Sequence, residues 1–406
     1  QTGTVNAAGT LDASAPGGGN GGFVDTSAAH VKIDDALKVT TAAPKGLTGM
    51  WLIDPTDFTI AASGGDQTGA FYSNALKSSN VSIATVASGG AAGDINVNDT
   101  ISWSANKLTL TAHNNIHINA PLRGSGTASL ALEYGQRAGA QGNGGGYYVN
   151  ATVDLPTGNN FSTRQGNDGD LVNYTVINSV GVAGSLSGID LQGINGNMQG
   201  NYVLGSHIDA SATADWNGGT GFSPLGGVQS PILGMPFMGK FDGLGHDIVG
   251  LTFRQPEDGM SIGMFNAIAS SGVVRNVNLI NTVMRTDSNA FGWSYMGMLA
   301  GANAGLIENV SAHGNVSLSG RYLFGGLVGA NDGTITDSRT SGSVDYFSAT
   351  GQGAGGLVHT NGEEGVISNS SSSMRVTVTG GAAGGLAETN IGAITKSFAT
   401  GAVTGA

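Results

Sequence analysis

Two glycine-framed motifs match patterns that carry chemistry in other proteins. Residues 259–263, Gly-Met-Ser-Ile-Gly, have the spacing of a nucleophile elbow, in which Ser261 would sit on a sharp turn between a strand and a helix. The residues that follow belong to a β-rich repeat, so the required helix is not expected. Residues 17–22, Gly-Gly-Gly-Asn-Gly-Gly, fit the GxGxxG fingerprint, but no strand–helix–strand unit surrounds them. Neither motif predicts a catalytic or a cofactor-binding residue.

The histidines do not predict a metal site. His113 and His117 have the spacing used by helical zinc sites. The residues around them alternate as in a strand, where positions four apart are separated by roughly 13 Å. Two imidazoles at that distance cannot share one metal ion, so we interpret both as solvent-facing. Asp-rich calcium-binding repeats are missing as well, and the sequence predicts no metal and no cofactor.

Paired carboxylates, which cleave glycosidic bonds, are scattered along the chain. The pairs do not recur between neighbouring repeats, and they are Asp34–Asp35, Asp54 with Asp57, and Glu363–Glu364. A polysaccharide-cleaving enzyme needs such groups to converge on one exposed sheet. Because they could still assemble across distant coils, a β-helical polysaccharide lyase or hydrolase stays an alternative. The leading prediction is a protein that is not an enzyme.

The composition favours a fold with many turns and short strands. The 406 residues include 70 Gly and 9 Pro, with 39% hydrophobic and 11% charged residues. This is too hydrophobic for general disorder and too poor in Pro for collagen. The net charge of −12 argues against nucleic acid and anionic membrane surfaces as partners. The absence of Cys suits an exported protein that crosses the periplasm unfolded, and the start at Gln1 suggests a mature or excised fragment.

The clearest signal is a repeat of about 29 residues in the last third of the chain. Gly-Met-Leu-Ala-Gly-Ala-Asn at 297–303 returns in related form at 325–331, 355–361 and 384–390. Four residue types recur in each copy, and they are Asn303, Asn331, Asn361 and Asn390; Leu299, Leu327, Leu357 and Leu386; Ile307, Ile335, Ile367 and Ile394; and Val316, Val344, Val376 and Val403. We expect the asparagines to stack at a turn rather than to bind a ligand.

The repeat behaves as one coil of a solenoid. A fainter fifth copy has Phe265, Val274 and Val283 in the same places, and the third copy tolerates the extra residues Glu363–Glu364 in its turn. An insertion at one corner that leaves the inward positions unchanged is typical of a solenoid. Aliphatic and small polar residues alternate with a period of two, as at 314–318. Stacked coils would place equivalent side chains directly above one another, about 4.8 Å apart.

The predicted fold class is therefore an all-β, right-handed parallel β-helix. An antiparallel sheet of hairpins is the alternative, but Asp332-Gly333 and Asn361-Gly362 mark turns once per repeat rather than once per strand. We divide the chain into irregular β-helix coils, a Gly-rich loop excursion, further coils with a loop near 212–227, and the repeat region; the ranges are 1–134, 135–170, 171–260 and 261–406.

Three aromatic residues in the predicted loops are candidate contacts. Tyr147, Tyr148 and Trp216 lie in Gly-rich stretches, and loops that project from a scaffold commonly carry recognition. They could stack on a sugar or anchor a protein partner. The alternative is that these rings only cover the sheet beneath them.

Several segments resemble the filamentous haemagglutinin-like adhesins of bacterial two-partner secretion. Gly-Gly-Leu-Val-Gly-Ala-Asn-Asp-Gly-Thr-Ile at 325–335 is similar to the GLUG-type repeats of these exoproteins, and the segments 241–248, 201–210 and 51–55 resemble neighbouring portions. The resemblance covers most of the chain, although the family's N-terminal secretion domain is not visible. It implies export through an outer-membrane pore, display at the bacterial cell surface, and adhesion to an unidentified receptor.

The leading functional prediction is a secreted, rigid β-helical segment of a surface adhesin. It would attach to host cells, matrix, glycans or biofilm components through many modest contacts. A passive structural spacer that carries an adhesive tip elsewhere is a further alternative.

Overall fold

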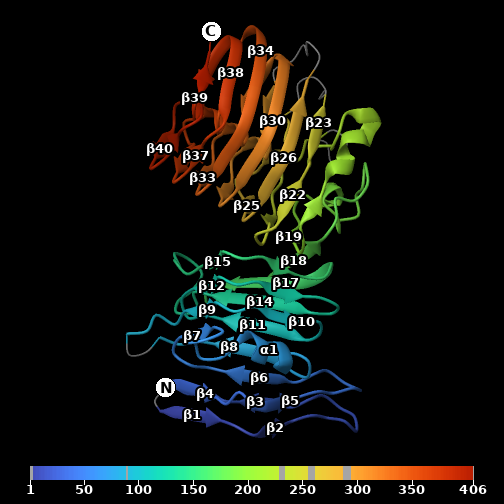
Figure 1. The fold of residues 1–406 in the computed structure, drawn as a ribbon, viewed down its shortest axis with the longest axis vertical. Helices are drawn as coiled ribbons and strands as arrows, with labels where there is room; N and C mark the ends of the chain where they lie inside the picture. The colour runs from blue at the N-terminus through green and yellow to red at the C-terminus, as the bar shows by residue number, and fades with distance from the viewer. Residues whose placement is uncertain (1–2, 88–89, 228–233, 255–260, 287–293, 406) are drawn as a thin grey trace. The chain divides into compact units, whose positions relative to one another are not determined.

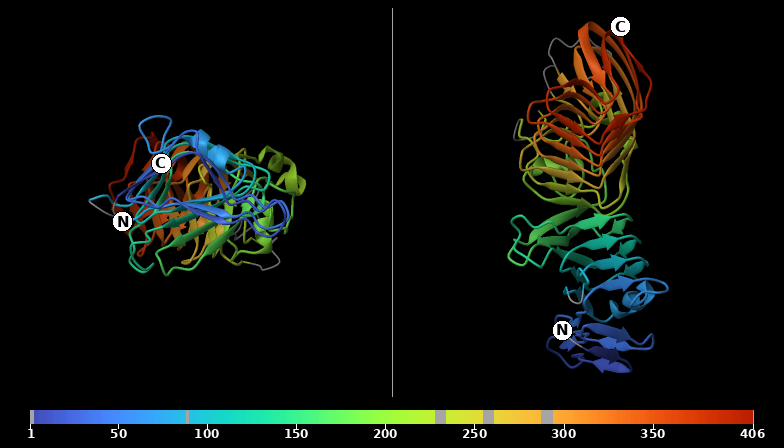
Figure 2. Two further views of the ribbon diagram at one scale, coloured as in Figure 1. Left: turned by 90° about the horizontal axis from the view of Figure 1, so that it is seen from below. Right: turned by 90° about the vertical axis from the view of Figure 1, so that its left-hand side faces the viewer.

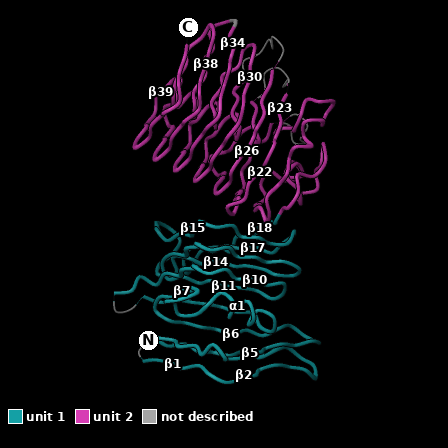
Figure 3. Tube along the Cα trace, viewed as in Figure 1, with its two compact units in different colours: residues 1–176 teal, residues 177–406 magenta. Residues whose placement is uncertain are grey.

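The computed structural model describes residues 3–87, 90–227, 234–254, 261–286 and 294–405. They form two compact units, residues 1–176 and 177–406 (Figures 1 and 3). The chain is all-β, with 48% strand and 6% helix, and winds as a β-solenoid of about 13 turns with parallel stacked strands. This confirms the predicted parallel β-solenoid. None of the described helices combines the length and the apolar character needed to cross a bilayer.

Unit 1 is built from five stacks of short strands that pair from one coil to the next. The stacks are β1 (Thr4–Ala7) with β4 (His30–Ile33); β2 (Thr10–Asp12) with β5 (Lys38–Thr40); β3 (Phe23–Asp25), β6 (Met50–Ile53), β8 (Asn80–Ala84), β11 (Lys107–Thr111), β14 (Ser129–Tyr134), β17 (Gly158–Gln165) and β18 (Val172–Ile177); β7 (Phe58–Ile60), β9 (Ile95–Val97), β12 (Ile116–Ile118) and β15 (Tyr147–Val149); and β10 (Ile101–Trp103), β13 (Leu122–Gly124) and β16 (Val153–Asp154). In the third stack β14 and β17 pair in parallel, whereas the last strand, β18, runs antiparallel to β17.

One coil of unit 1 contains a short helix in place of a strand. Helix α1 (Gly69–Ala75) begins after Thr68, whose side-chain oxygen accepts a hydrogen bond from the Phe71 backbone N–H at 3.2 Å. Such an N-cap satisfies a backbone donor that the first turn leaves unpaired. Tyr72 and Leu76 on its inner side are fully buried. The helix was not predicted from the sequence.

The predicted loop excursion at 135–170 is wrong for most of its length. Strands β15, β16 and β17 pair in register with β12, β13 and β14, so this Gly-rich stretch is an ordinary coil. Its glycines let the turn pack tightly instead of projecting: a Cβ on Gly145 would come within 2.5 Å of the Gly135 Cα. Asn143 fastens the same turn by donating from Nδ2 to the Gly135 carbonyl.

Unit 2 consists of longer and more regular coils with three stacks (Figure 2). The stacks are β24 (Phe265–Ile268), β28 (Ala300–Asn303), β32 (Val328–Asn331), β35 (Val358–Asn361) and β39 (Ala387–Asn390); β19 (Tyr202–Leu204), β21 (Lys240–Asp242), β25 (Val273–Arg275), β29 (Leu306–Glu308), β33 (Thr334–Thr336), β36 (Val366–Ser368) and β40 (Ala393–Thr395); and a broad sheet of β20 (Ile208–Asp209), β22 (Asp247–Val249), β23 (Thr252–Arg254), β26 (Asn278–Arg285), β27 (Ser294–Met296), β30 (Ser311–Gly320), β31 (Tyr322–Gly325), β34 (Arg339–Gly355), β37 (Ser371–Ser372), β38 (Arg375–Gly384), β41 (Phe398–Ala399) and β42 (Val403–Thr404).

The region before the repeats contains two short 3-10 segments, η1 (Gln192–Gly196) and η2 (Ser211–Gly219). The second occupies the start of the loop predicted near 212–227. Its chain is kinked at Trp216, Asn217 and Gly218, whose backbone angles are not helical. The segment predicted as a loop thus begins with a 3-10 segment, and isolated bridges join Gly221 to Phe253 and Leu225 to Phe265 in its second part.

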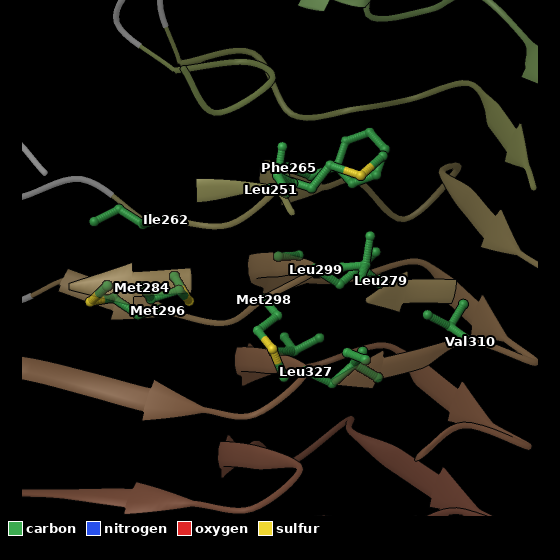
Figure 4. Close-up of a cluster of buried hydrophobic side chains, with 14 of the residues drawn as sticks. Leu251, Ile262, Phe265, Leu279, Met284, Met296, Met298, Leu299, Val310 and Leu327 are labelled. Atoms are coloured by element: carbon green, nitrogen blue, oxygen red, sulfur yellow. The ribbon is translucent and has the colours of Figure 1, made fainter. Parts of the chain in front are cut away.

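The core of unit 2 consists of vertical files of the predicted aliphatic residues. The backbone N–H of Leu299 donates to the Leu327 carbonyl at 3.0 Å, and that of Leu327 to the Leu357 carbonyl at 2.7 Å. All three leucines are fully buried, and Figure 4 shows Leu299 and Leu327 on successive coils. The isoleucine file and the valine file pair in the same way through all four copies. The two-residue insertion at 363–364 stays in a turn, as predicted.

The fifth copy is only partly in the predicted register. Val274 pairs with Ile307, as expected. Phe265 pairs with Ala300 rather than Leu299, and Val283 pairs with Asn315, so that Met284 stands opposite Val316. The cause in β26 is an irregularity between Leu279 and Thr282, which shifts the pairing and turns Val283 away from the core.

Candidate functional site

The recurring asparagines form a ladder, as predicted, which is buried at its first three members and exposed at Asn390. Asn303 Nδ2 donates to Asn331 Oδ1, Asn331 Nδ2 to Asn361 Oδ1, and Asn361 Nδ2 to Asn390 Oδ1, each at 2.8 Å. Asn303 also closes its own turn, because Nδ2 donates to the Gly305 carbonyl and Oδ1 accepts from the Gly305 N–H. The hydrogen bonds between coils and within the turn occupy the side-chain amide groups inside the wall, so the ladder has a structural role.

A serine column at the following corner was not predicted from the sequence. Val310 N–H donates to Ser338 Oγ, Ser338 N–H to Ser370 Oγ, and Ser370 N–H to Ser397 Oγ, at 3.0 to 3.2 Å. Each serine follows a residue with left-handed backbone. The preceding residues are Asp337, Asn369 and Lys396. The recurrence of Ser three positions after the last three repeat isoleucines could have revealed the column.

The two glycine motifs occupy places unsuited to catalysis or phosphate binding. Part of the elbow pattern, residues 259–260, lies outside the described residues. Ser261 is half-buried, and strand β24 follows it four residues later instead of a helix. Residues 17–22 form turns and irregular backbone between β2 and β3.

The two histidines lie on either side of a corner. His113 follows the end of β11, and His117 lies in β12. Both are half-buried rather than fully solvent-facing, and the His117 ring stacks on Tyr148 with centroids 5.0 Å apart. Within the described ranges, no group of three or more His, Cys, Asp or Glu side chains is arranged to hold a metal ion.

The candidate acids are used locally in turns. Asp34 Oδ1 accepts from the Ala36 N–H at 2.7 Å, and Asp35 Oδ1 accepts from Gln67 Nε2 at 3.3 Å. Asp57 Oδ1 accepts from two backbone N–H groups of the next coil, at 93 and 94. Glu363 and Glu364 are exposed in a turn of unit 2. These contacts hold turns and coils together.

Of the three candidate aromatics, two cover the core. Tyr147 is 5% exposed, and the half-buried Trp216 stacks on the buried Phe222 with centroids 6.3 Å apart. Tyr148 is 46% exposed and, with its partner His117, is the member of the set that remains open to solvent.

A groove lies beside helix α1 in unit 1. It has a volume of about 760 Å³, with Leu37, Val39 and Phe71 among its apolar lining and Asp35 and Lys38 among its polar lining. The groove arises because α1 lies between β5 and the next strand of that wall. A helix is about 10 Å wide and cannot continue a strand spacing of about 4.8 Å.

One buried titratable pair lies inside the wall of unit 2. His359 Nε2 is 3.7 Å from Glu388 Oε2, and the rings of His359 and Tyr295 lie in a T-shaped arrangement with centroids 6.4 Å apart. Burial lowers the pKa of His359, and the nearby Glu388 carboxylate partly opposes that shift. Gly301 and Gly329 stand at the same position of the preceding coils, so this pair interrupts a column of glycines.

The outer face of the broad sheet of unit 2 is a mainly polar surface. Along β30 the burial alternates residue by residue, and Val316 and Leu318 point inward while His313, Asn315 and Ser317 are exposed. The same alternation continues on β34, which pairs with β30 over ten residues. Strands β26, β30, β34 and β38 lie side by side (Figure 1). This surface was not predicted from the sequence.

Two hollows lie on that face. One has a volume of about 470 Å³ and is lined by side chains that include Ser311, His313, Arg339 and Ser341. The other has a volume of about 580 Å³ and includes Phe347, which is 56% exposed. Hydroxyl, imidazole and guanidinium groups of this kind bind ligands through hydrogen bonds and charge.

Comparison with known proteins gives only partial similarity. The chain is 39% identical over 145 residues to Halomucin from Haloquadratum walsbyi, which covers 35% of this chain and 2% of that protein. It is 34% identical over 110 residues to a putative Gly-rich membrane protein from Evansella cellulosilytica, covering 27% of this chain and 12% of that protein. No family model and no solved structure matches. The chain therefore spans a small part of these relatives, and its resemblance to haemagglutinin-like exoproteins stays a prediction.

Proposed function

We propose that the chain is a segment of a secreted surface protein, which attaches to host cells, matrix or biofilm material through the outer face of its β-solenoid. The observation that carries this proposal is the polar outer face of β30, β34 and β38, which repeats over successive coils. Repetition multiplies modest contacts, since a second contact on the same partner forms at high effective concentration.

Export through an outer-membrane pore and adhesion of the haemagglutinin type are parts of the proposal that rest on the sequence resemblance. The name of one partial relative, a putative Gly-rich membrane protein, agrees with a place at the cell envelope. The parallel solenoid supplies a stiff scaffold, because the same ladders and core files bind each coil to its neighbours.

The test is attachment by the purified chain. Beads coated with it should bind at least one of three materials, namely cultured host cells, extracellular matrix or biofilm polysaccharide, above beads coated with an unrelated solenoid. Retention on none of these materials would favour a passive spacer. Release of reducing sugar ends from the polysaccharide would favour the enzyme alternative and contradict the proposal.

A further inference from the structure

We propose that the outer face of unit 2 carries a site for the carboxylate of an acidic polysaccharide, centred on Arg339. This inference rests on the proposed attachment function and names the chemistry of one partner. The site consists of six side chains on three successive coils, called here the Arg339 grid: Ser311, His313, Arg339, Ser341, Ser371 and Ser373.

Strand register brings the grid together. Ser311 pairs with Arg339, and Arg339 pairs with Ser371, so the three lie in one row across three coils. His313 pairs with Ser341 in the next outward row, and Ser373 follows Ser371 by two positions. Neighbours in a row are about 4.8 Å apart, and the two rows are about 6.6 Å apart. Both spacings lie within reach of one sugar residue and its carboxylate.

The central guanidinium is available to a ligand. Arg339 is exposed, and its guanidinium makes no hydrogen bond or ion pair with any residue that the structure describes. The neighbouring cation on this face differs: Arg375 Nη2 lies 3.0 Å from Asp345 Oδ2 and is already neutralised. A free guanidinium binds a carboxylate through two parallel hydrogen bonds, which are stronger than those between neutral groups.

The other grid members favour a sugar over a simple anion. His313 Nδ1 and Ser341 Oγ are 3.0 Å apart, and Ser311 Oγ donates to Asn278 Oδ1 at 2.6 Å, so these groups are already oriented. Ser371 and Ser373 add two further hydroxyls beside the cation. The Arg339 row continues to Phe398, which pairs with Ser371 and is 61% exposed. A cation, several hydroxyls and an aromatic ring match a carboxylate, ring hydroxyls and the apolar face of a uronic acid.

Local charge distinguishes this place from the rest of an acidic chain. The whole chain has a net charge of −12, whereas the Arg339 grid contains a guanidinium and no carboxylate. At an ionic strength of about 0.15 M, charges beyond about 8 Å are largely screened. The grid therefore acts on a bound carboxylate mainly through its own groups, and binding should be measured at that ionic strength.

The test uses the full chain and an oligomer of galacturonic acid as the probe. Binding is followed by calorimetry at fixed ionic strength, and the methyl ester of the same oligomer serves as the uncharged control. Arg339→Ser should weaken binding of the acid by about tenfold or more, the size expected for one charge-assisted contact. Arg375→Ser removes an equal charge from the same face and should change it by less than about twofold.

Several results would overturn the proposal. These are equal loss in the two arginine variants, equal binding of the methyl ester, tighter binding of a sulfated oligomer of the same length, or no binding of the acid by the native chain. The bead assay separates the two proposals: attachment that survives Arg339→Ser supports the general function and rejects this site. Attachment that falls with Arg339→Ser but not with Arg375→Ser supports both.

Discussion

Units 1 and 2 are both built from stacked parallel coils but hold neighbouring coils together by different polar contacts. In unit 1 the contacts are carried by varied turn residues, such as Asp57 and Asp94, which bond to backbone N–H groups of the next coil. An asparagine series at 98, 119 and 150 is also present there, but it is exposed. In unit 2 a buried asparagine ladder and a serine column recur at fixed corners. The sequence repeat is therefore visible in unit 2, where identical residues stack at the same position of successive coils.

The largest expected effect concerns the apolar core, in which the two units should not differ. Leu327→Ala in unit 2 and Leu108→Ala in unit 1 each truncate a fully buried side chain. Each should lower the free energy of unfolding by about 2–5 kcal/mol, because contacts are lost and a cavity is left. Urea denaturation, combined with hydrogen exchange of the affected coil, measures this loss in each variant. Leu386→Ala, at a half-buried copy of the same file, should cost less; an equal cost would argue against burial as the cause.

The second prediction should separate the units. Asn331→Ala removes two rungs of the ladder and leaves the Nδ2 group of Asn303 without its acceptor on the next coil. Loss of buried hydrogen bonds of this kind costs about 1–3 kcal/mol each. Asn119→Ala breaks an equivalent series in unit 1, but water can replace its partners, so the loss should stay below about 1 kcal/mol.

Thermal unfolding and bead attachment of these asparagine variants should be measured side by side. The expected result for Asn331→Ala is a lower melting temperature with unchanged attachment per folded molecule. An unchanged melting curve with lost attachment would show instead that the ladder binds a partner.

A smaller effect is expected at helix α1, which is specific to unit 1. Thr68→Ala removes the side-chain acceptor of the Phe71 N–H and should cost about 1 kcal/mol. Thr68→Ser keeps the hydroxyl and should restore most of the stability. Hydrogen exchange at the Phe71 amide provides the measurement, and equal protection in the Ala and Ser variants would exclude the cap as its source.

The smallest expected effect is a pH dependence confined to unit 2. Burial lowers the pKa of His359 below its usual 6.5, so the unfolded chain binds this proton more readily than the folded chain. The contribution of His359 to stability is therefore full above pH 6.5 and declines as the pH falls below it. Above pH 6.5 the unfolding free energies of the native chain and of His359→Gln should change with pH at the same rate. Below pH 6.5 the unfolding free energy of the native chain should fall more steeply than that of His359→Gln. A steeper loss of stability below pH 6.5 that persists unchanged in His359→Gln would contradict the assignment to His359.

The sequence predicted unit 2 better than unit 1 because four copies repeat the same residue at the same inward position. Leu299, Leu327 and Leu357 could be aligned by eye, and the structure stacks them. Unit 1 offers no such copies. The run Gly69–Ala75 has no long helical periodicity, and its helix depends on the Thr68 cap and on burial of Tyr72. The fifth copy was placed one residue off at Val283, because an irregularity in one strand cannot be read from spacing.

The sequence by itself determined the parallel solenoid, the aliphatic files and the asparagine ladder, since each follows from a repeat length and a two-residue alternation. Only the tertiary structure decided which outward side chains become neighbours. Arg339 lies 28 residues after Ser311 and 32 residues before Ser371, and those separations mean nothing until the coils stack in register. Outward positions are free of the core's packing constraint and vary from coil to coil. The periodicity of the sequence therefore does not predict the surface that they form.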